Sequence, residues 1–243
     1  MPSLVDPYLK AGWAGKHLDT LRDQLRTYYA QPELCALVGE DDIKNQRYIV
    51  RIKVKPVPDP IALTLGDCLG CLRASLDQVV WSLASLSLPD PEHTQFPIIE
   101  KWDADSIKRF DSQTRGVCAK AKRIIKDLQP DQGGDAATPR SHHLWLLNKM
   151  CNIDKHRKIP ARGGAFDITM PQGLDLTLFH FDDTGVISGP LSLKDKMAFD
   201  PPHSFKVIFG DPDSGIECDI DRLGTIHDFV ANTVIPRFAG FFS

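Results

Sequence analysis

Long uninterrupted hydrophobic runs are missing from this sequence of 243 residues. No stretch approaches the roughly 18 consecutive apolar residues that a membrane-spanning helix requires. The first residues, MPSLVDPYLKAGWAGKH, also lack the basic-then-apolar order of a secretory signal. We therefore expect a soluble, cytoplasmic protein with no membrane segment.

Cysteine is scarce for a chain of this length, with six residues. Most of them lie within apolar helical patterns, which favours free buried thiols over a disulfide framework. Cys68 and Cys71 form a CxxC pair, but the second pair of ligands that a structural zinc site needs is missing, and Leu69 and Leu72 place the pair on a core helix. No Gly-rich phosphate loop or G-x-S-x-G motif is present either. We predict no metal site and no cofactor.

Charge is distributed unevenly along the chain. Residues 100–160 carry 13 basic against 8 acidic side chains, a net charge of +5, whereas residues 161–243 carry 6 against 12, a net charge of -6. Such asymmetry is typical of an anion-binding face, and equally of two parts of one domain that attract each other.

Apolar spacing predicts two long N-terminal helices. Over residues 7–29, six apolar residues recur at spacings of three to five and are expected to share one buried face: Leu9, Trp13, Leu18, Leu21, Leu25 and Tyr28. Seven more form a heptad seam that ends before Pro89 and predicts a central packing helix: Leu65, Leu69, Leu72, Leu76, Val79, Leu83 and Leu86. Gly66 and Gly70 beside this seam would let another helix approach closely.

The remaining pattern favours an α+β fold. A strand is predicted over 48–55 and an extended segment at 96–98. Helices are predicted near 103–110 and 116–128, and a third helix runs from its cap at Thr138 and Pro139 to His156. The last helix is predicted over 223–234, and Pro236 is expected to disturb it. Alternating apolar residues predict strands over 166–170, 174–178 and 205–209 that form an antiparallel sheet. We expect one domain, 1–243, with a helical layer over about 1–160, a strand-rich layer over about 161–220 and a closing helix over about 220–240.

One polar cluster is predicted between two helices. Arg73 and Asp77 border the leucine seam, and Asp154 continues the stripe of Leu147 and Cys151, so a carboxylate points where an apolar residue would be expected. The candidate cluster also includes Asn148, Asn152, Lys155, His156 and Arg157. In the structural interpretation, Arg73 pairs with Asp154 and Asp77 pairs with Arg157, which fixes the helix register.

Three segments carry a resemblance to a known family: GDCLGCLRASLDQV (66–79), TQFPI (94–98) and LNKMCNIDKHR (147–157). They are similar to a widespread group of uncharacterised bacterial proteins that have an LRxxLDxL helix, an FPI segment, an N-x-x-DKHR segment and a V-x-FG strand, matched here by Val207 to Gly210. This resemblance covers most of the chain and implies relatives, without implying an activity.

The chain also resembles HEPN-type helical ribonucleases, in which an Arg is followed four to six residues later by a His at a helix junction. This sequence departs from that pattern, because Gln78 stands where the spacing from Arg73 calls for His, and Lys149 is the nearest basic residue upstream of His156. The resemblance implies that His156 acts as general acid or base on RNA, and that Arg73 or Arg157 stabilises charge on the phosphate.

Two functions therefore stand as hypotheses. The first is a binding or interaction protein whose charged cluster is structural, with an anionic ligand on the basic middle segment. The alternative is a phosphodiester-acting enzyme that uses His156 with Arg73 and Arg157, for which RNA would be the partner.

Overall fold

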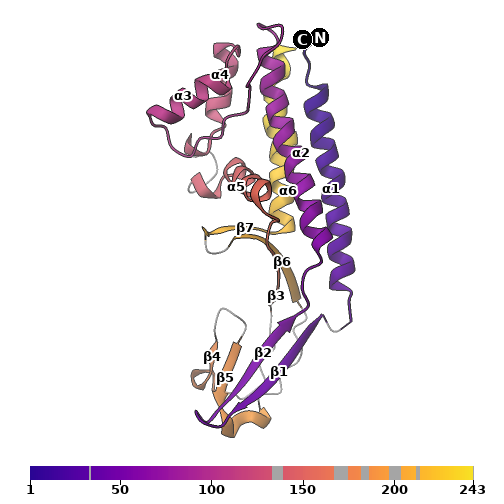
Figure 1. The fold of residues 1–243 in the computed structure, drawn as a ribbon, viewed down its shortest axis with the longest axis vertical. Helices are drawn as coiled ribbons and strands as arrows, with labels where there is room; N and C mark the ends of the chain where they lie inside the picture. Colours follow the sequence, from indigo (N-terminus) through magenta and orange to yellow (C-terminus); the bar gives the residue numbers. More distant parts are fainter. Residues whose placement is uncertain are drawn as a thin grey trace. The chain divides into compact units, whose positions relative to one another are not determined.

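The computed structural model describes residues 1–32, 34–132, 139–166, 175–181, 186–196, 204–211 and 214–242. Its helices and strands are α1 (Val5–Tyr29), β1 (Cys35–Asp42), β2 (Arg47–Val54), α2 (Asp59–Ala84), α3 (Ala104–Gln113), α4 (Ala119–Asp127), α5 (His143–His156), β3 (Ala161–Phe166), β4 (His180–Phe181), β5 (Val186–Pro190), β6 (Ser204–Asp211), β7 (Ile216–Cys218) and α6 (Ile220–Asp228) (Figure 1). The predicted α+β class is confirmed.

The chain divides into two compact units. The helical unit contains Met1–Asp23, Asp59–Pro160 and Phe209–Ser243, and the strand unit contains Gln24–Pro58 and Ala161–Ile208. A boundary between them thus coincides with the change of pattern predicted near residue 160. The strand unit also includes 24–58, because β1 and β2 pair with each other and β2 pairs with β5.

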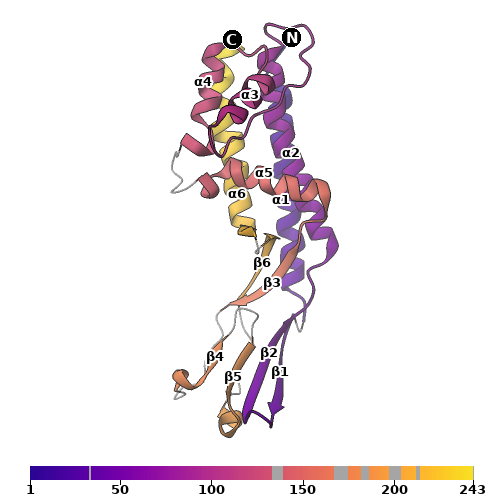
Figure 2. The same ribbon diagram turned by 60° about the vertical axis from the view of Figure 1, so that its left-hand side comes forward.

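In the helical unit, α1, α2 and α6 run side by side (Figures 1 and 2). The predicted seam of α2 is buried from Leu65 to Leu83, with at most 2% of each side chain exposed. Leu86 lies beyond the end of α2 and is exposed, so the seam is one residue shorter than predicted. α5 packs against α2 and α6.

The predicted buried face of α1 is only partly correct. Leu18, Leu21, Leu25 and Tyr28 are buried, but 66% of Leu9 and 52% of Trp13 are exposed. The five-residue step from Trp13 to Leu18 turns an α-helix by about 140° beyond a full turn, so the predicted stripe mixed two opposite faces. The first turns of α1 instead bury Ala11 and Ala14.

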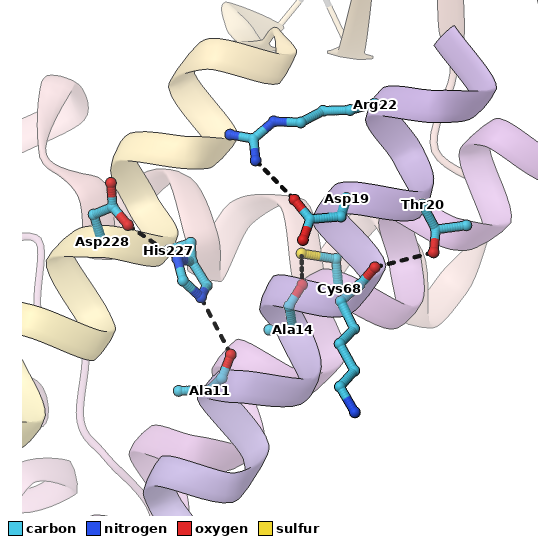
Figure 3. A network of polar contacts seen from close by, with 9 residues as sticks. Ala11, Ala14, Asp19, Thr20, Arg22, Cys68, His227 and Asp228 are labelled. Atoms are coloured by element: carbon cyan, nitrogen blue, oxygen red, sulfur yellow. Dashed lines mark hydrogen bonds and ion pairs between the residues drawn. The ribbon is translucent and has the colours of Figure 1, made fainter. Parts of the chain in front are cut away.

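Reciprocal glycines bring α1 and α6 together. A Cβ on Gly15 of α1 would lie 3.2 Å from His227 Nε2 of α6, and a Cβ on Gly224 of α6 would lie 3.3 Å from Arg22 Nη2 of α1. Figure 3 shows His227 between the Asp228 carboxylate, 3.1 Å from Nδ1, and the Ala11 carbonyl oxygen, 3.2 Å from Nε2. Each helix therefore has a glycine at the position where the other helix places a polar side chain.

The strand unit contains a four-stranded sheet with the order β1-β2-β5-β4. Its pairs are antiparallel, and one face packs on a small core of Val50, Phe179 and Ile187 with Leu37, Tyr48 and Leu193. β2 confirms the strand predicted at 48–55. A second sheet has the order β3-β6-β7, and β6 contains the predicted Phe205, Val207 and Phe209.

Three predicted element boundaries need correction. Leu176–Leu178 forms a 3₁₀ helix where a strand was expected, and 167–174 lie outside the described residues. α5 begins at His143, after a 3₁₀ turn at Pro139–Ser141, and its cap is His142; Thr138 lies outside the described residues. The disturbance predicted at Pro236 begins earlier, because α6 continues as a π-helix over Phe229–Val234 and a 3₁₀ helix over Ile235–Phe241.

Candidate functional site

Arg73 and Asp77 of α2 hold the extended segment at Phe96. Arg73 Nη2 lies 2.9 Å from Asp77 Oδ1 and donates to the Phe96 carbonyl oxygen at 2.7 Å, while the same Asp77 oxygen accepts from the Phe96 backbone N–H at 2.9 Å. Phe96 is fully buried, so its backbone groups need partners from the protein. The two side chains form a clamp on one residue of the TQFPI segment.

Burial raises the pKa of the Asp77 carboxyl, and it outweighs the opposing effects of Arg73 and the Phe96 N–H. Only 10% of the Arg73 side chain is exposed, and its Nη1 has no hydrogen-bond partner among the described residues. The guanidinium is therefore engaged inside the protein and presents no free donor at the surface.

The predicted pair between Arg73 and Asp154 is not formed. Asp154 lies over Gly66 instead, where a Cβ on residue 66 would come within 2.6 Å of Asp154 Oδ1. Gly66 is seven residues from Arg73, roughly 10 Å along the helix axis. Asp154 as a whole residue is exposed, and it has no ion pair within the described ranges. Its carboxyl is partly buried, and this burial, followed by repulsion from Asp67, raises its pKa.

The predicted pair between Asp77 and Arg157 is also wrong. Arg157 Nη2 lies 3.0 Å from Asp211 Oδ2. Lys155 and His156 are exposed on the last turn of α5, Asn152 is exposed one turn earlier, and Asn148 is half-buried. The structure thus brings together Arg73 and Asp77, with the Lys155 charge near enough to oppose the rise in the pKa of Asp77, and leaves His156 at the surface.

Three of the cysteines are buried and held as thiols. Burial raises the pKa of Cys68, Cys151 and Cys218 to about 12 in each case. Cys68 Sγ donates to the Ala14 carbonyl oxygen at 3.4 Å and Cys151 Sγ to the Leu69 carbonyl oxygen at 3.6 Å. Among the described residues, no three His, Cys, Asp or Glu side chains are grouped so that they could hold a metal ion.

His142 and His143 stand at the start of α5, where solvated first-turn side chains were expected, but the structure buries His142. His142 Nδ1 accepts from the Leu144 backbone N–H at 3.1 Å, and its ring meets Phe229 edge-on at 5.5 Å between centroids. Burial, followed by the charges of His143 and Arg222, lowers the pKa of His142 from the usual 6.5 to about 4. The signal was the His-His pair directly before the apolar run LWLL, although His is an unusual helix cap.

Sequence reasoning missed an apolar surface on α1. Val5, Leu9, Gly12, Trp13 and Lys16 lie on the solvent side of this helix, and we call them the α1 outer face. The exposed fractions are 61% for Val5, 66% for Leu9 and 52% for Trp13. An adjoining groove of about 560 Å³ is lined by Ser3, Leu4, Val5, Tyr8, Leu9, Ala239 and Phe242. Contiguous exposed apolar side chains of this kind mark interaction surfaces more often than scattered ones.

The basic middle segment reaches the surface on α4. Lys120, Arg123 and Lys126 are exposed, and Lys122 pairs with Asp111 at 3.7 Å. The ammonium of Lys120 lies 5.7 Å from the centre of the Phe241 ring, and that of Lys126 lies 5.0 Å from the centre of the Trp102 ring. These contacts hold two of the three exposed cations close to the protein surface.

Comparison with protein-family models, with curated proteins and with solved structures gives no match. None of the helices within the described ranges has both the length and the apolar character that crossing a membrane requires.

Proposed function

We propose that this protein acts by binding a macromolecular partner through the α1 outer face, and that its Arg73–Asp77 pair is structural. The observation that carries the proposal is the exposure of Leu9 and Trp13 on one side of a helix whose other side is buried. Two large apolar side chains that stay exposed together are the informative exception in a folded protein. The adjoining apolar groove supports the same conclusion.

The arrangement of the charged cluster favours binding over catalysis. A transition-state phosphate needs donors aimed at an accessible position. Arg73 directs Nη2 to Asp77 and to the Phe96 carbonyl and is nearly buried, and Arg157 is paired with Asp211. His156 would then have to act alone from an exposed helix end.

A cleavage assay tests this proposal against the ribonuclease alternative. The full chain is incubated with single-stranded RNA, beside the His156→Ala variant and a blank. We expect RNA to remain intact to the same extent in all three. Cleavage by the parent that disappears in His156→Ala would overturn the proposal and establish the enzyme.

An anionic ligand on α4 is a second proposal, supported by the exposed Lys120, Arg123 and Lys126. The expected result is salt-sensitive binding of an RNA oligonucleotide, weakened by Arg123→Glu, because contacts with phosphates release counterions. Fluorescence anisotropy at two salt concentrations measures it. Binding that Arg123→Glu leaves unchanged would reject α4 as the site.

A further inference from the structure

We propose that the partner of the α1 outer face is a second copy of this chain, paired antiparallel about a two-fold axis between Lys10 and Ala11. This inference rests on the proposed function, since it names the occupant of the same surface. The first argument is spacing. Val5, Leu9, Gly12 and Lys16 follow one another at steps of four, three and four, the heptad order of a helix-pairing seam, on the side of α1 that faces solvent.

The second argument is shape. Gly12 is exposed, and a Cβ built on it would have no heavy atom within 4 Å, so the helix surface is hollowed at this position. Leu9, three residues earlier, projects from the same face. In an antiparallel pair with its axis between residues 10 and 11, Leu9 of each copy lies opposite Gly12 of the other. A projecting side chain then fills a hollow, twice by symmetry.

The third argument is charge. The same register places Val5 opposite Lys16 of the second copy, so that the Lys16 stem covers an apolar side chain while its ammonium reaches the neighbouring Asp6. Both Asp6 and Lys16 are exposed, and neither has an ion pair among the described residues. The Lys16 ammonium lies 4.5 Å from the centre of the Trp13 ring on the same face, a contact that it would exchange for the Asp6 carboxylate of the second copy. Complementary charges that meet twice select this register over a parallel one, in which Lys16 would meet Lys16.

The area favours self-association of moderate strength. A standard interface buries about 800 Å² on each partner. Three turns of one helix make a contact smaller than that, so we expect a monomer–dimer equilibrium that depends on protein concentration.

Sedimentation velocity of the full chain over a wide concentration range tests the inference. The parent should sediment as a monomer when dilute and as a dimer when concentrated. Leu9→Asp should raise the dimer dissociation constant at least tenfold. Leu63→Asp is the matched control, because Leu63 is 61% exposed on α2, and it should leave the constant unchanged. Circular dichroism checks that each variant is folded.

A charge swap tests the register itself. Asp6→Lys and Lys16→Asp should each weaken the dimer, and the double variant Asp6→Lys/Lys16→Asp should recover it, because both ion pairs form again with reversed sign. A parent that stays monomeric at every concentration, or a dimer that Leu9→Asp leaves intact, would overturn the inference. A double variant no tighter than the two single ones would overturn it as well. These outcomes are independent of the RNA cleavage assay, so each proposal can fail alone.

Discussion

The Asp77 carboxylate of α2 accepts a hydrogen bond from the Phe96 backbone N–H at 2.9 Å, across 19 positions of sequence. Because the same oxygen lies 2.9 Å from Arg73, replacing Asp77 removes an acceptor and a counterion together. Asp77→Ala should lower the free energy of unfolding by about 3 kcal/mol, since a buried guanidinium loses its counterion and a buried N–H loses its acceptor.

Asp154→Ala is the matched control for that change. Asp154 is exposed and has no ion pair among the described residues, so its replacement should stay within about 0.5 kcal/mol of the parent. Urea unfolding of both variants compares the two free energies. Equal losses would show that the Arg73–Asp77 pair does not hold the Phe96 segment. The structure thus reverses the importance that sequence reasoning gave to Asp154.

Gly66 and Asp154 should be energetically coupled. Gly66→Ala adds about 1 kcal/mol of helix propensity to α2, but its methyl group must displace the Asp154 carboxylate. In the Asp154→Ala background this carboxylate is absent, so the same substitution should be more stabilising there. A double-mutant cycle by urea unfolding measures the difference. Strictly additive effects would contradict the close approach.

His142 should make the protein acid-sensitive. Its pKa is about 4 in the folded state and near 6.5 when unfolded, so the unfolded chain takes up the proton first as the pH falls. The stabilisation that depends on neutral His142 is therefore fully present above pH 6.5 and is lost as the pH falls to 4, by at most on the order of 3 kcal/mol because solvent partly screens the ring. His142→Asn keeps a cap for the Leu144 N–H but does not titrate.

The measurement is the free energy of unfolding at several pH values between 7 and 4.5. His142→Asn should show a shallower decline than the parent, and the exposed His156→Asn should decline like the parent. An unchanged slope in His142→Asn would mean that His142 is not buried in its neutral form.

Gly12 and Gly15 should respond oppositely to alanine. Gly12 faces open space, so Gly12→Ala should stabilise the monomer by about 1 kcal/mol through helix propensity. Gly15→Ala gains the same propensity but brings a methyl group to 3.2 Å from His227 Nε2, which must move from its place between Ala11 and Asp228. Thermal unfolding at low protein concentration compares the melting temperatures of the two variants. The ranking fails if Gly15→Ala is as stabilising as Gly12→Ala.

The helices could be predicted from the sequence where the apolar residues kept one spacing over many turns. The α2 seam follows a strict heptad, and its interior is buried as expected. In α1, the stripe combined one step of five with steps of three and four, so it joined Leu9 and Trp13, which face away from the core, to residues of the buried face. β1 was not predicted because its residues are mostly exposed on both faces and therefore show little alternation.

The site was predictable only in part, for a physical reason. The position of Arg73 and Asp77 at the edge of the core follows from helical spacing. Their partner is the backbone of Phe96, and backbone acceptors and donors leave no signature in the pattern of side chains. The Asp154 carboxylate was assigned a cation as its neighbour, whereas its neighbour is a glycine that provides space.

The π-helix at Phe229–Val234 keeps the last helix in phase. Ile226, Val230 and Val234 are four residues apart and all fully buried. On a regular α-helix this spacing drifts by about 40° a step, so Val234 would lie about 80° away from Ile226 around the helix. A π-helix has more residues in each turn than an α-helix, so each residue rotates the chain less and this drift is offset. Removing one residue, such as Ala231, would restore ordinary helical bonding but turn everything beyond it by about 100°. The length of this segment is therefore constrained more tightly than its composition.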